Sequence, residues 1–205
     1  MKIRFNSDFH IGSGIGKVGY IDSLFVKDSQ GNPVITGQTL KGMLRDSCQR
    51  IAKSFNIKCN NNRECICPVC EIFGRESRHG KYLFNPAYLK TETKDKEYPV
   101  RKRTSIDRDI GTAKEKALFS TEVAPQNLEF EFTIKPKPSK KPEELEMILL
   151  IAGILWTREI GGNRRRGLGH CRMTIDEPRI DKNALKSELL KLKELSNKDS
   201  EVNNV

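Results

Sequence analysis

The order in which strand-like and helix-like segments follow one another constrains the fold of this chain most. Apolar residues alternate with polar ones in two stretches, residues 2–11 and 127–134, which is the period of a half-buried strand. Apolar residues recur at helical spacing after each stretch, from about 36–39 to 55 and from Pro142 to about 159. Shorter strands are expected at 81–89 and 170–175. The order strand, helix, strand, insertion, strand, helix, strand predicts an α+β, ferredoxin-like βαββαβ palm.

We expect this palm to form one domain over residues 1–178. RNA-recognition modules share the same pattern of elements. Two insertions interrupt it, a cysteine-rich one at 57–80 and a strongly charged one at 90–122. The charged insertion lacks apolar periodicity, so we expect it to protrude and to become ordered on a partner. Residues 179–205 are rich in Lys, Glu and Asn with leucines on one stripe, which predicts a charged C-terminal helix that frays.

Four cysteines lie within twelve residues, in the pattern C-x5-C-x-C-x2-C: Cys59, Cys65, Cys67 and Cys70. Zinc prefers four such ligands in a tetrahedron, and two intervening residues let a cysteine pair reach one ion. The pattern therefore predicts a structural Zn²⁺, with His79 able to replace Cys59 or Cys65. The remaining two, Cys48 and Cys171, lie in predicted regular elements and are expected to be small buried hydrophobes.

Composition narrows the class of partner and the compartment. Lys and Arg exceed Asp and Glu by ten, and the isoelectric point is about 9.4, so a polyanion is the first partner to consider. No apolar run approaches the ~20 residues that span a bilayer, and the N-terminus lacks the apolar core of a signal peptide. We therefore expect a cytoplasmic protein with no membrane partner, in which clustered thiols bind metal and do not form disulfides.

Two basic segments could hold a sugar-phosphate backbone. The first is a glycine-arginine loop, whose candidate RNA-binding residues are Gly161, Gly162, Arg164, Arg165, Arg166, Gly167 and Gly169. Glycines let another backbone come close, and guanidinium groups match phosphate oxygens. The second is the start of the first helix, with Thr39, Lys41 and Arg45, where free N–H groups attract phosphate. An exposed basic turn and a solvated basic helix face remain the alternatives.

A glycine-rich loop, Gly12 to Gly19, leads to the segment Tyr20-Ile-Asp22-Ser23. A lone aspartate more often caps a turn than takes part in chemistry, so spacing alone favours the turn for Asp22. The role of His10, at the end of the first strand, is likewise not decided by its position in the sequence.

Five motifs in this order resemble the RAMP superfamily of CRISPR-associated proteins, and more narrowly the backbone subunit of type III effector complexes. They extend from residue 2 to about residue 178 and comprise Phe9-His10-Ile11-Gly12-Ser13-Gly14, Ile21-Asp22-Ser23, the stretch from Ile35 to Arg45, Cys67-Pro-Val-Cys70-Glu-Ile-Phe73-Gly74, and 161–169. Two departures stand out: Thr36-Gly-Gln-Thr39 replaces the usual Pro-Gly-Ser-Ser, and Asn85-Pro86-Ala87 replaces Ser-Asp-Ala.

The resemblance implies a zinc-bound insertion, a protruding thumb at 90–122, and copies that stack along a CRISPR guide RNA beside other effector subunits. It places Asp22 at the position that cuts single-stranded target RNA, with Mg²⁺ or Mn²⁺ as the expected ion for cleavage, and it assigns His10 to RNA contact. A non-catalytic RAMP subunit remains the first alternative. A guide-processing endoribonuclease with His10 as general base remains the second.

Overall fold

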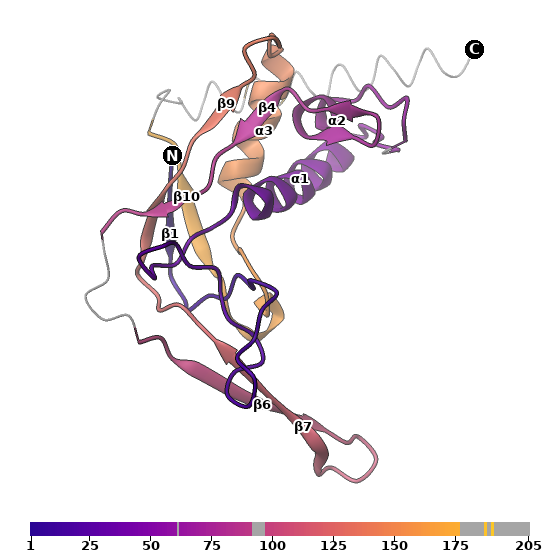
Figure 1. Ribbon diagram of the computed structural model, residues 1–205. Helices are drawn as coiled ribbons and strands as arrows, with labels where there is room; N and C mark the ends of the chain where they lie inside the picture. Colours follow the sequence, from indigo (N-terminus) through magenta and orange to yellow (C-terminus); the bar gives the residue numbers. More distant parts are fainter. Residues whose placement is uncertain (61, 92–96, 177–186, 188–189, 191–205) are drawn as a thin grey trace.

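A four-stranded antiparallel sheet forms the centre of the protein. A computed structural model describes residues 1–60, 62–91, 97–176, 187 and 190 (Figure 1). The strand order is β10-β1-β8-β5, and each neighbouring pair is antiparallel. The four strands are β1 (Lys2–Phe5), β5 (Tyr88–Leu89), β8 (Glu129–Glu131) and β10 (Cys171–Thr174).

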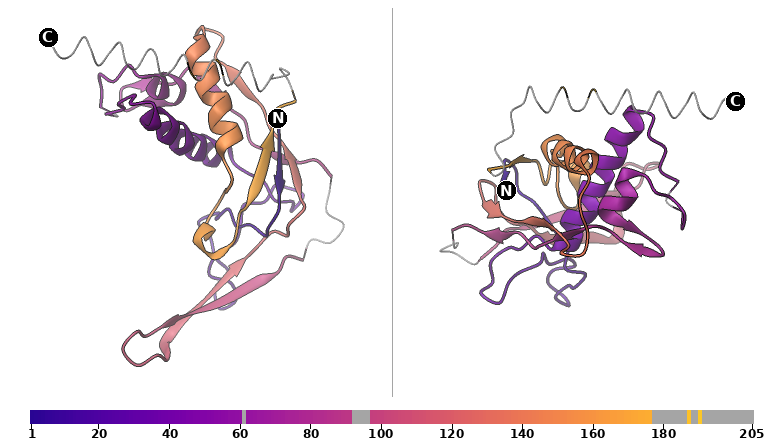
Figure 2. Two further views of the ribbon diagram at one scale, coloured as in Figure 1. Left: turned by 180° about the vertical axis from the view of Figure 1, so that it is seen from behind. Right: turned by 90° about the horizontal axis from the view of Figure 1, so that it is seen from above.

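Two helices, α1 (Gly37–Ser54) and α3 (Glu144–Trp156), pack against each other on one side of this sheet, as the two views in Figures 1 and 2 show. The alternation in β1 explains the choice of face, because Ile3 and Phe5 are completely buried while Arg4 is exposed. The apolar stripe of α1 meets these side chains in one continuous core, together with Phe130 from β8. The packing places the start of α1 beside the chain segment that follows β1.

Capping residues set where the two helices begin. The Thr36 hydroxyl accepts a hydrogen bond from the Thr39 amide at 3.2 Å, so Thr36, and not Thr39, is the N-cap of α1. Glu143 caps α3 through a reciprocal capping box with Glu146. Pro142 therefore precedes the N-cap, which corrects its expected position as the first helical residue.

The cysteine-rich insertion folds into a short helix and a hairpin that lie against α1 and α3. Its elements are α2 (Pro68–Phe73), β2 (Gly74–Arg75) and β3 (Arg78–His79), and the next strand, β4 (Tyr82–Phe84), pairs with β9 (Ile134–Pro136). Val69 and Ile72 are fully buried in the core. The Lys81 ammonium group lies 2.6 Å from Glu146 and 3.5 Å from Glu71, which ties the insertion to the start of α3.

A long hairpin, β6 (Val100–Ile106) and β7 (Ala113–Glu122), projects from the rest of the molecule (Figure 1). We expected the charged insertion to become ordered only on a partner, and this expectation is wrong for residues 97–122. The two strands pair with each other from Val100 opposite Glu122 to Ile106 opposite Ala113. Both faces of the hairpin are largely exposed, so the sequence shows no alternation even though the strands are regular.

Two predicted strands are shorter than expected. The strand predicted at 2–11 ends at Phe5, and the chain bends before Phe9 pairs with Ala124. The strand predicted at 127–134 is divided between β8 and β9, which belong to different sheets. The predicted C-terminal helix lies outside the described residues, apart from 187 and 190. Among the described helices, none has the length and apolar content needed to cross a bilayer.

Candidate functional site

The glycine-arginine loop after α3 is held against the segment that follows β1. The Gly162 amide donates to the carbonyl oxygen of His10 and the Gly169 amide to that of Asp8, both at 2.8 Å. Gly161 has a φ of +96°, and a Cβ there would overlap the His10 carbonyl oxygen, so this close approach requires glycine. The loop is therefore held in place against the chain segment that follows β1.

The three arginines of the loop form one turn of 3₁₀ helix, η1 (Arg164–Arg166). Three residues complete such a turn, so their side chains leave in three directions. Arg164 lines a cleft of about 460 Å³ between the loop and α1. Arg166 lies near Arg103 of the β6–β7 hairpin, and burial, then the charges of Arg166 and Arg101, lower the pKa of Arg103. The loop thus faces both the cleft and the hairpin.

The cleft joins three of the predicted segments. Ile11 and Gly12 come from the chain after β1, Thr39 from the first turn of α1, and Gly161 and Gly162 from the loop, with Gly42, Met43, Asp46, Arg50 and Arg164 completing the lining. The lining residues of α1 recur every three or four positions, so one face of the helix forms this wall.

Lys41 and Arg45 do not line this cleft. Each residue turns the helix by about 100°, so Lys41 lies about 160° and Arg45 about 120° around α1 from Thr39, which lines the cleft. Burial, and then the charges of Arg45 and Lys137, lower the pKa of Lys41. The structure therefore places Lys41 and Arg45 in a second basic cluster with Lys137, apart from the glycine-arginine loop.

Asp22 is bound to the base of the β6–β7 hairpin. Its Oδ2 atom accepts hydrogen bonds from the Ser120 amide at 2.6 Å and from the Ser120 hydroxyl at 2.8 Å, and its own amide lies 3.1 Å from the Ser120 carbonyl oxygen. The backbone hydrogen bond from Ser120, and then that of its hydroxyl, lower the pKa of Asp22 below 3.8. Asp22 is therefore an exposed, ionised carboxylate whose Oδ1 accepts no hydrogen bond from the described residues.

His10 is buried beneath this surface. One ring nitrogen, Nδ1, lies 2.7 Å from the carbonyl oxygen of Glu122 and Nε2 lies 3.0 Å from the Ser23 hydroxyl. Nδ1 donates to that carbonyl oxygen, and Nε2 shares a hydrogen bond with the Ser23 hydroxyl. His10 thus joins the Asp22 segment to the β6–β7 hairpin by its ring and to the glycine-arginine loop by its carbonyl oxygen, and it presents no ring nitrogen to a ligand in this arrangement.

Ser120 is the site residue that the sequence did not reveal. It lies 98 positions from Asp22 in a charged stretch, and serine is common in such stretches, so no local pattern marks it. Pairing of the 22–23 segment with residues 120–122, including a parallel bridge between Ser23 and Thr121, is what brings the two together. A contact at this separation depends on tertiary structure.

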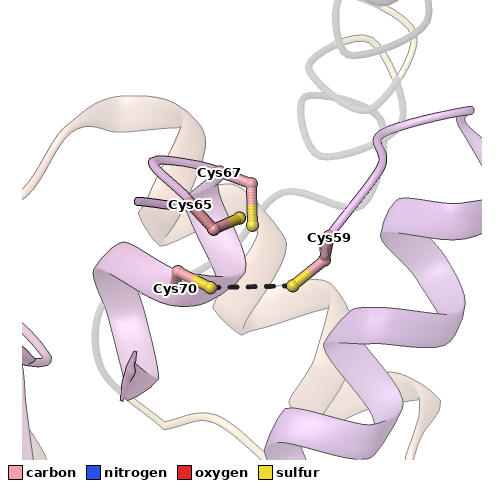
Figure 3. A group of neighbouring side chains, drawn as sticks. All are labelled: Cys59, Cys65, Cys67 and Cys70. Carbon is pink, nitrogen blue, oxygen red and sulfur yellow. Dashed lines mark hydrogen bonds between the residues drawn. The ribbon is translucent and has the colours of Figure 1, made fainter. Parts of the chain in front are cut away.

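The four clustered cysteines converge on one point (Figure 3). Their sulfur atoms all lie within 4.8 Å of one another, and those of Cys59 and Cys70 are 3.6 Å apart. Four sulfurs at 2.3 Å from a tetrahedral zinc ion lie about 3.8 Å apart, so the spacing fits the ion. His79 lies in β3 and is not a member of this group, so the four sulfur atoms form the candidate ligand set among the described residues.

The thiols of this cluster influence one another. Burial raises the pKa of Cys65, but hydrogen bonds from Cys67 and Cys70 outweigh it and lower that pKa to about 6. Burial, and then the neighbouring thiols of Cys59 and Cys65, raise the pKa of Cys70 to about 12. One thiolate therefore disfavours the next, and a dication would relieve that repulsion. Cys48 and Cys171 are buried in the core, as expected.

Comparison with known proteins agrees with this arrangement. The chain is 26% identical over 183 residues to "CRISPR system Cms endoribonuclease Csm3" of Methanocaldococcus jannaschii, which covers 82% of this chain and 74% of the relative. A chain of the structure "Type III-B Cmr-beta Cryo-EM structure of the Apo state" superposes on this one with a TM-score of 0.61 at 14% identity. The superposition covers 87% of this chain and 97% of that one, so the two share a fold. The model of the RAMP superfamily matches residues 2–172, so the chain belongs to the RAMP superfamily.

Proposed function

We propose that this protein is a guide-RNA-binding backbone subunit of a type III CRISPR effector complex and that it cleaves complementary target RNA at Asp22. The observation that carries the proposal is the exposed Asp22 carboxylate, held by Ser120 at the root of a projecting hairpin. The relative named as the endoribonuclease Csm3 supports the same reaction.

The architecture supports the subunit role. The strand order β10-β1-β8-β5 with α1 and α3 on one side fits a ferredoxin-like palm, on which residues 57–80 and 90–122 are a zinc insertion and a thumb. Copies of the chain would stack along the guide RNA beside other effector subunits. The thumb would then extend from each palm toward the guide–target duplex. The complex would act in the cytoplasm, where thiols stay reduced.

The guide would bind across the cleft between α1 and the glycine-arginine loop. Arg164 faces that cleft and Arg166 lies near Arg103 of the hairpin, while Arg165, Gly167 and Gly169 are the remaining RNA-binding candidates of the loop. Guanidinium groups on an exposed turn pair with phosphates regardless of base sequence. Lys41 and Arg45, on the other face of α1, would meet a separate stretch of RNA. His10 would act by positioning the surrounding loops, because its ring is buried.

The proposed reaction is attack of a target ribose 2′-hydroxyl on the adjacent phosphate, in line with the leaving 5′-oxygen. A carboxylate with a lowered pKa is a weak base near neutral pH, so Asp22 is suited to orient the nucleophile or to hold a cation. One carboxylate with a phosphate oxygen is a common way to bind Mg²⁺, and Asp22 Oδ1, which accepts no hydrogen bond from the described residues, would be the protein ligand. A bound Mg²⁺ or Mn²⁺ would stabilise negative charge on the phosphate.

The zinc ion would be structural. Its four sulfur ligands stand together, and α2, which begins at Pro68 directly after Cys67, packs into the core through Val69 and Ile72. The ion would therefore fix the insertion against α1 and α3 and take no part in the cleavage of RNA.

A guide-processing endoribonuclease that uses His10 as its base fits less well, because both ring nitrogens of His10 are bound inside the protein. A non-catalytic RAMP subunit would differ by tolerating the loss of Asp22. The test is target cleavage by the assembled complex containing Asp22→Ala, Asp22→Asn or, as a control carboxylate on another surface, Asp176→Ala.

Both Asp22 variants should lose cleavage while guide and target affinities stay within about threefold, which is under ~0.7 kcal/mol. Added Mg²⁺ or Mn²⁺ should restore cleavage after chelation only where Asp22 is intact. Normal cleavage by the Asp22→Ala complex, equal to that of Asp176→Ala, would leave only the binding function.

A further inference from the structure

The tight turn that precedes Asp22 is a fixed structure. The Lys17 amide donates to the carbonyl oxygen of Ile21 at 2.7 Å, and the Tyr20 amide donates to that of Lys17 at 3.0 Å. Gly19 has a φ of +74°, the value that a type II turn requires at its third residue. The side chains at the tip therefore project from a defined backbone.

Two of these side chains are large, apolar and turned toward solvent. Tyr20 is 77% exposed and Val18 is fully exposed. A tyrosine on a fixed turn presents a flat apolar face and loses little conformational entropy when it binds. The Lys17 ammonium group lies 5.3 Å from the centroid of the Tyr20 ring, in cation–π contact. An aromatic face beside a cation is the combination that binds a nucleotide, by base stacking and by pairing with phosphate.

Ser120 contacts both the turn and Asp22. The Ser120 hydroxyl that donates to Asp22 lies 3.3 Å from the Tyr20 carbonyl oxygen. A Cβ on Gly16 would stand 2.6 Å from the carbonyl oxygen of Asp22, so the two arms of the loop pack at a distance that suits glycine alone. Two residues span at most about 7 Å, so the Tyr20 ring can reach a nucleotide whose phosphate contacts Asp22.

We propose that Tyr20 stacks on the RNA base that adjoins the phosphodiester cut at Asp22, with Lys17 paired to a neighbouring phosphate. This inference rests on the proposed function and adds the group that the site recognises, an unpaired base of any identity. Stacking depends on the size of the π-face, so purines at that position should be cut faster than pyrimidines.

The test uses the assembled complex and a target RNA that carries either a normal or an abasic nucleotide beside the mapped cleavage site. Tyr20→Ala should slow cleavage of the normal target about tenfold, within the range of one base–aromatic stack. The same variant should cut the abasic target at the native rate for that target. Tyr20→Phe, which keeps the ring, should match the native protein, and Val18→Ala, on the same turn, is the control.

A second readout does not depend on cutting. The fluorescent base 2-aminopurine, moved along a 2′-O-methyl target, should be quenched at one position in each repeat by the native and Tyr20→Phe complexes and released by Tyr20→Ala. Equal fluorescence with and without the ring would refute the stacking even if Asp22 cuts. Equal slowing of cleavage by Tyr20→Ala on the normal and abasic targets would also refute the stacking. Loss of complex assembly in Tyr20→Ala would refute it too, because the turn would then bind protein. Cleavage by an Asp22→Ala complex would contradict the proposed function alone, because the quenching still tests the stack.

Discussion

Replacing Gly153 with alanine should destabilise the pairing of α1 and α3. The two helices cross at this glycine, where a Cβ would overlap Sγ of Cys48 and stand 3.7 Å from the Leu44 carbonyl oxygen. Cys48 is completely buried and its thiol lies 3.4 Å from the Leu149 carbonyl oxygen, so it cannot swing aside. Overpacking at such a site costs roughly 3 kcal/mol. Alanine in place of glycine returns about 1 kcal/mol of helix propensity, which leaves about 2 kcal/mol of destabilisation.

Urea unfolding at constant zinc concentration, followed by the fluorescence of Trp156, measures this difference in free energy. A loss of about 2 kcal/mol corresponds to a melting temperature roughly 4–8 °C lower for a chain of this size. The matched control is Gly42→Ala in α1, where a Cβ meets nothing within 4 Å and the change should stabilise by up to about 1 kcal/mol.

A double variant tests the physical reason. Cys48→Ala removes the sulfur that the new methyl group meets, so Cys48→Ala with Gly153→Ala should lie within about 1 kcal/mol of the native protein. The coupling energy between the two sites should be near 2 kcal/mol. If Gly153→Ala is as stable as the native protein, or if the two changes are additive, the helices do not meet at this point as described.

Three further outcomes follow from the sites. Replacing Cys67 and Cys70 with serine should release about one zinc ion per chain and lower the melting temperature, and native protein free of zinc by elemental analysis would rule the site out. Reversing the charges of residues 164–166 should weaken binding to all guides alike and flatten the salt dependence by roughly 0.7 per lost phosphate contact, whereas a change that depends on base sequence would mean that the loop reads bases. Ser120→Ala should raise the pKa of Asp22 toward 3.8, and carboxyl-carbon NMR would measure this pKa. Because that pKa is lowered in the fold, the contact stabilises the protein above pH 3.8, and this stabilisation is lost as the pH falls through the lowered value. An unchanged pKa of Asp22 in Ser120→Ala would contradict the hydrogen bond from Ser120.

Local patterns in the sequence were sufficient to predict the two long helices, the strand β1 and the convergence of the four cysteines. The close spacing of the cysteines makes their convergence a local property of the chain. The apolar stripe of α1 and the alternation in β1 likewise reflect periods of a few residues, and the structure retains both. The sequence predicted the start of α1 only as about 36–39, and the hydrogen bond from the Thr39 amide to the Thr36 hydroxyl fixes it.

Contacts between distant segments escaped sequence reasoning. Ser120 meets Asp22 across 98 positions, and His10 meets Glu122 across 112, so neither partner is marked by a nearby residue. The thumb was read as unstructured because its charges lie on both faces of a hairpin that has little core to bury. The arginine loop was predicted as one site, yet a 3₁₀ turn divides its side chains between the cleft and the thumb.

Crosslinking from position 22 tests most directly whether Asp22 lies at the phosphodiester that is cut. The complex would be assembled with the photoreactive residue p-azidophenylalanine in place of Asp22, bound to target RNA and irradiated, with the same residue at Asp176 as the control. Crosslinks from position 22 should fall within one nucleotide of every cleavage site mapped with the native complex, and those from position 176 should not. Crosslinks from position 22 only to the guide, or only to target nucleotides far from the cleavage sites, would contradict the account.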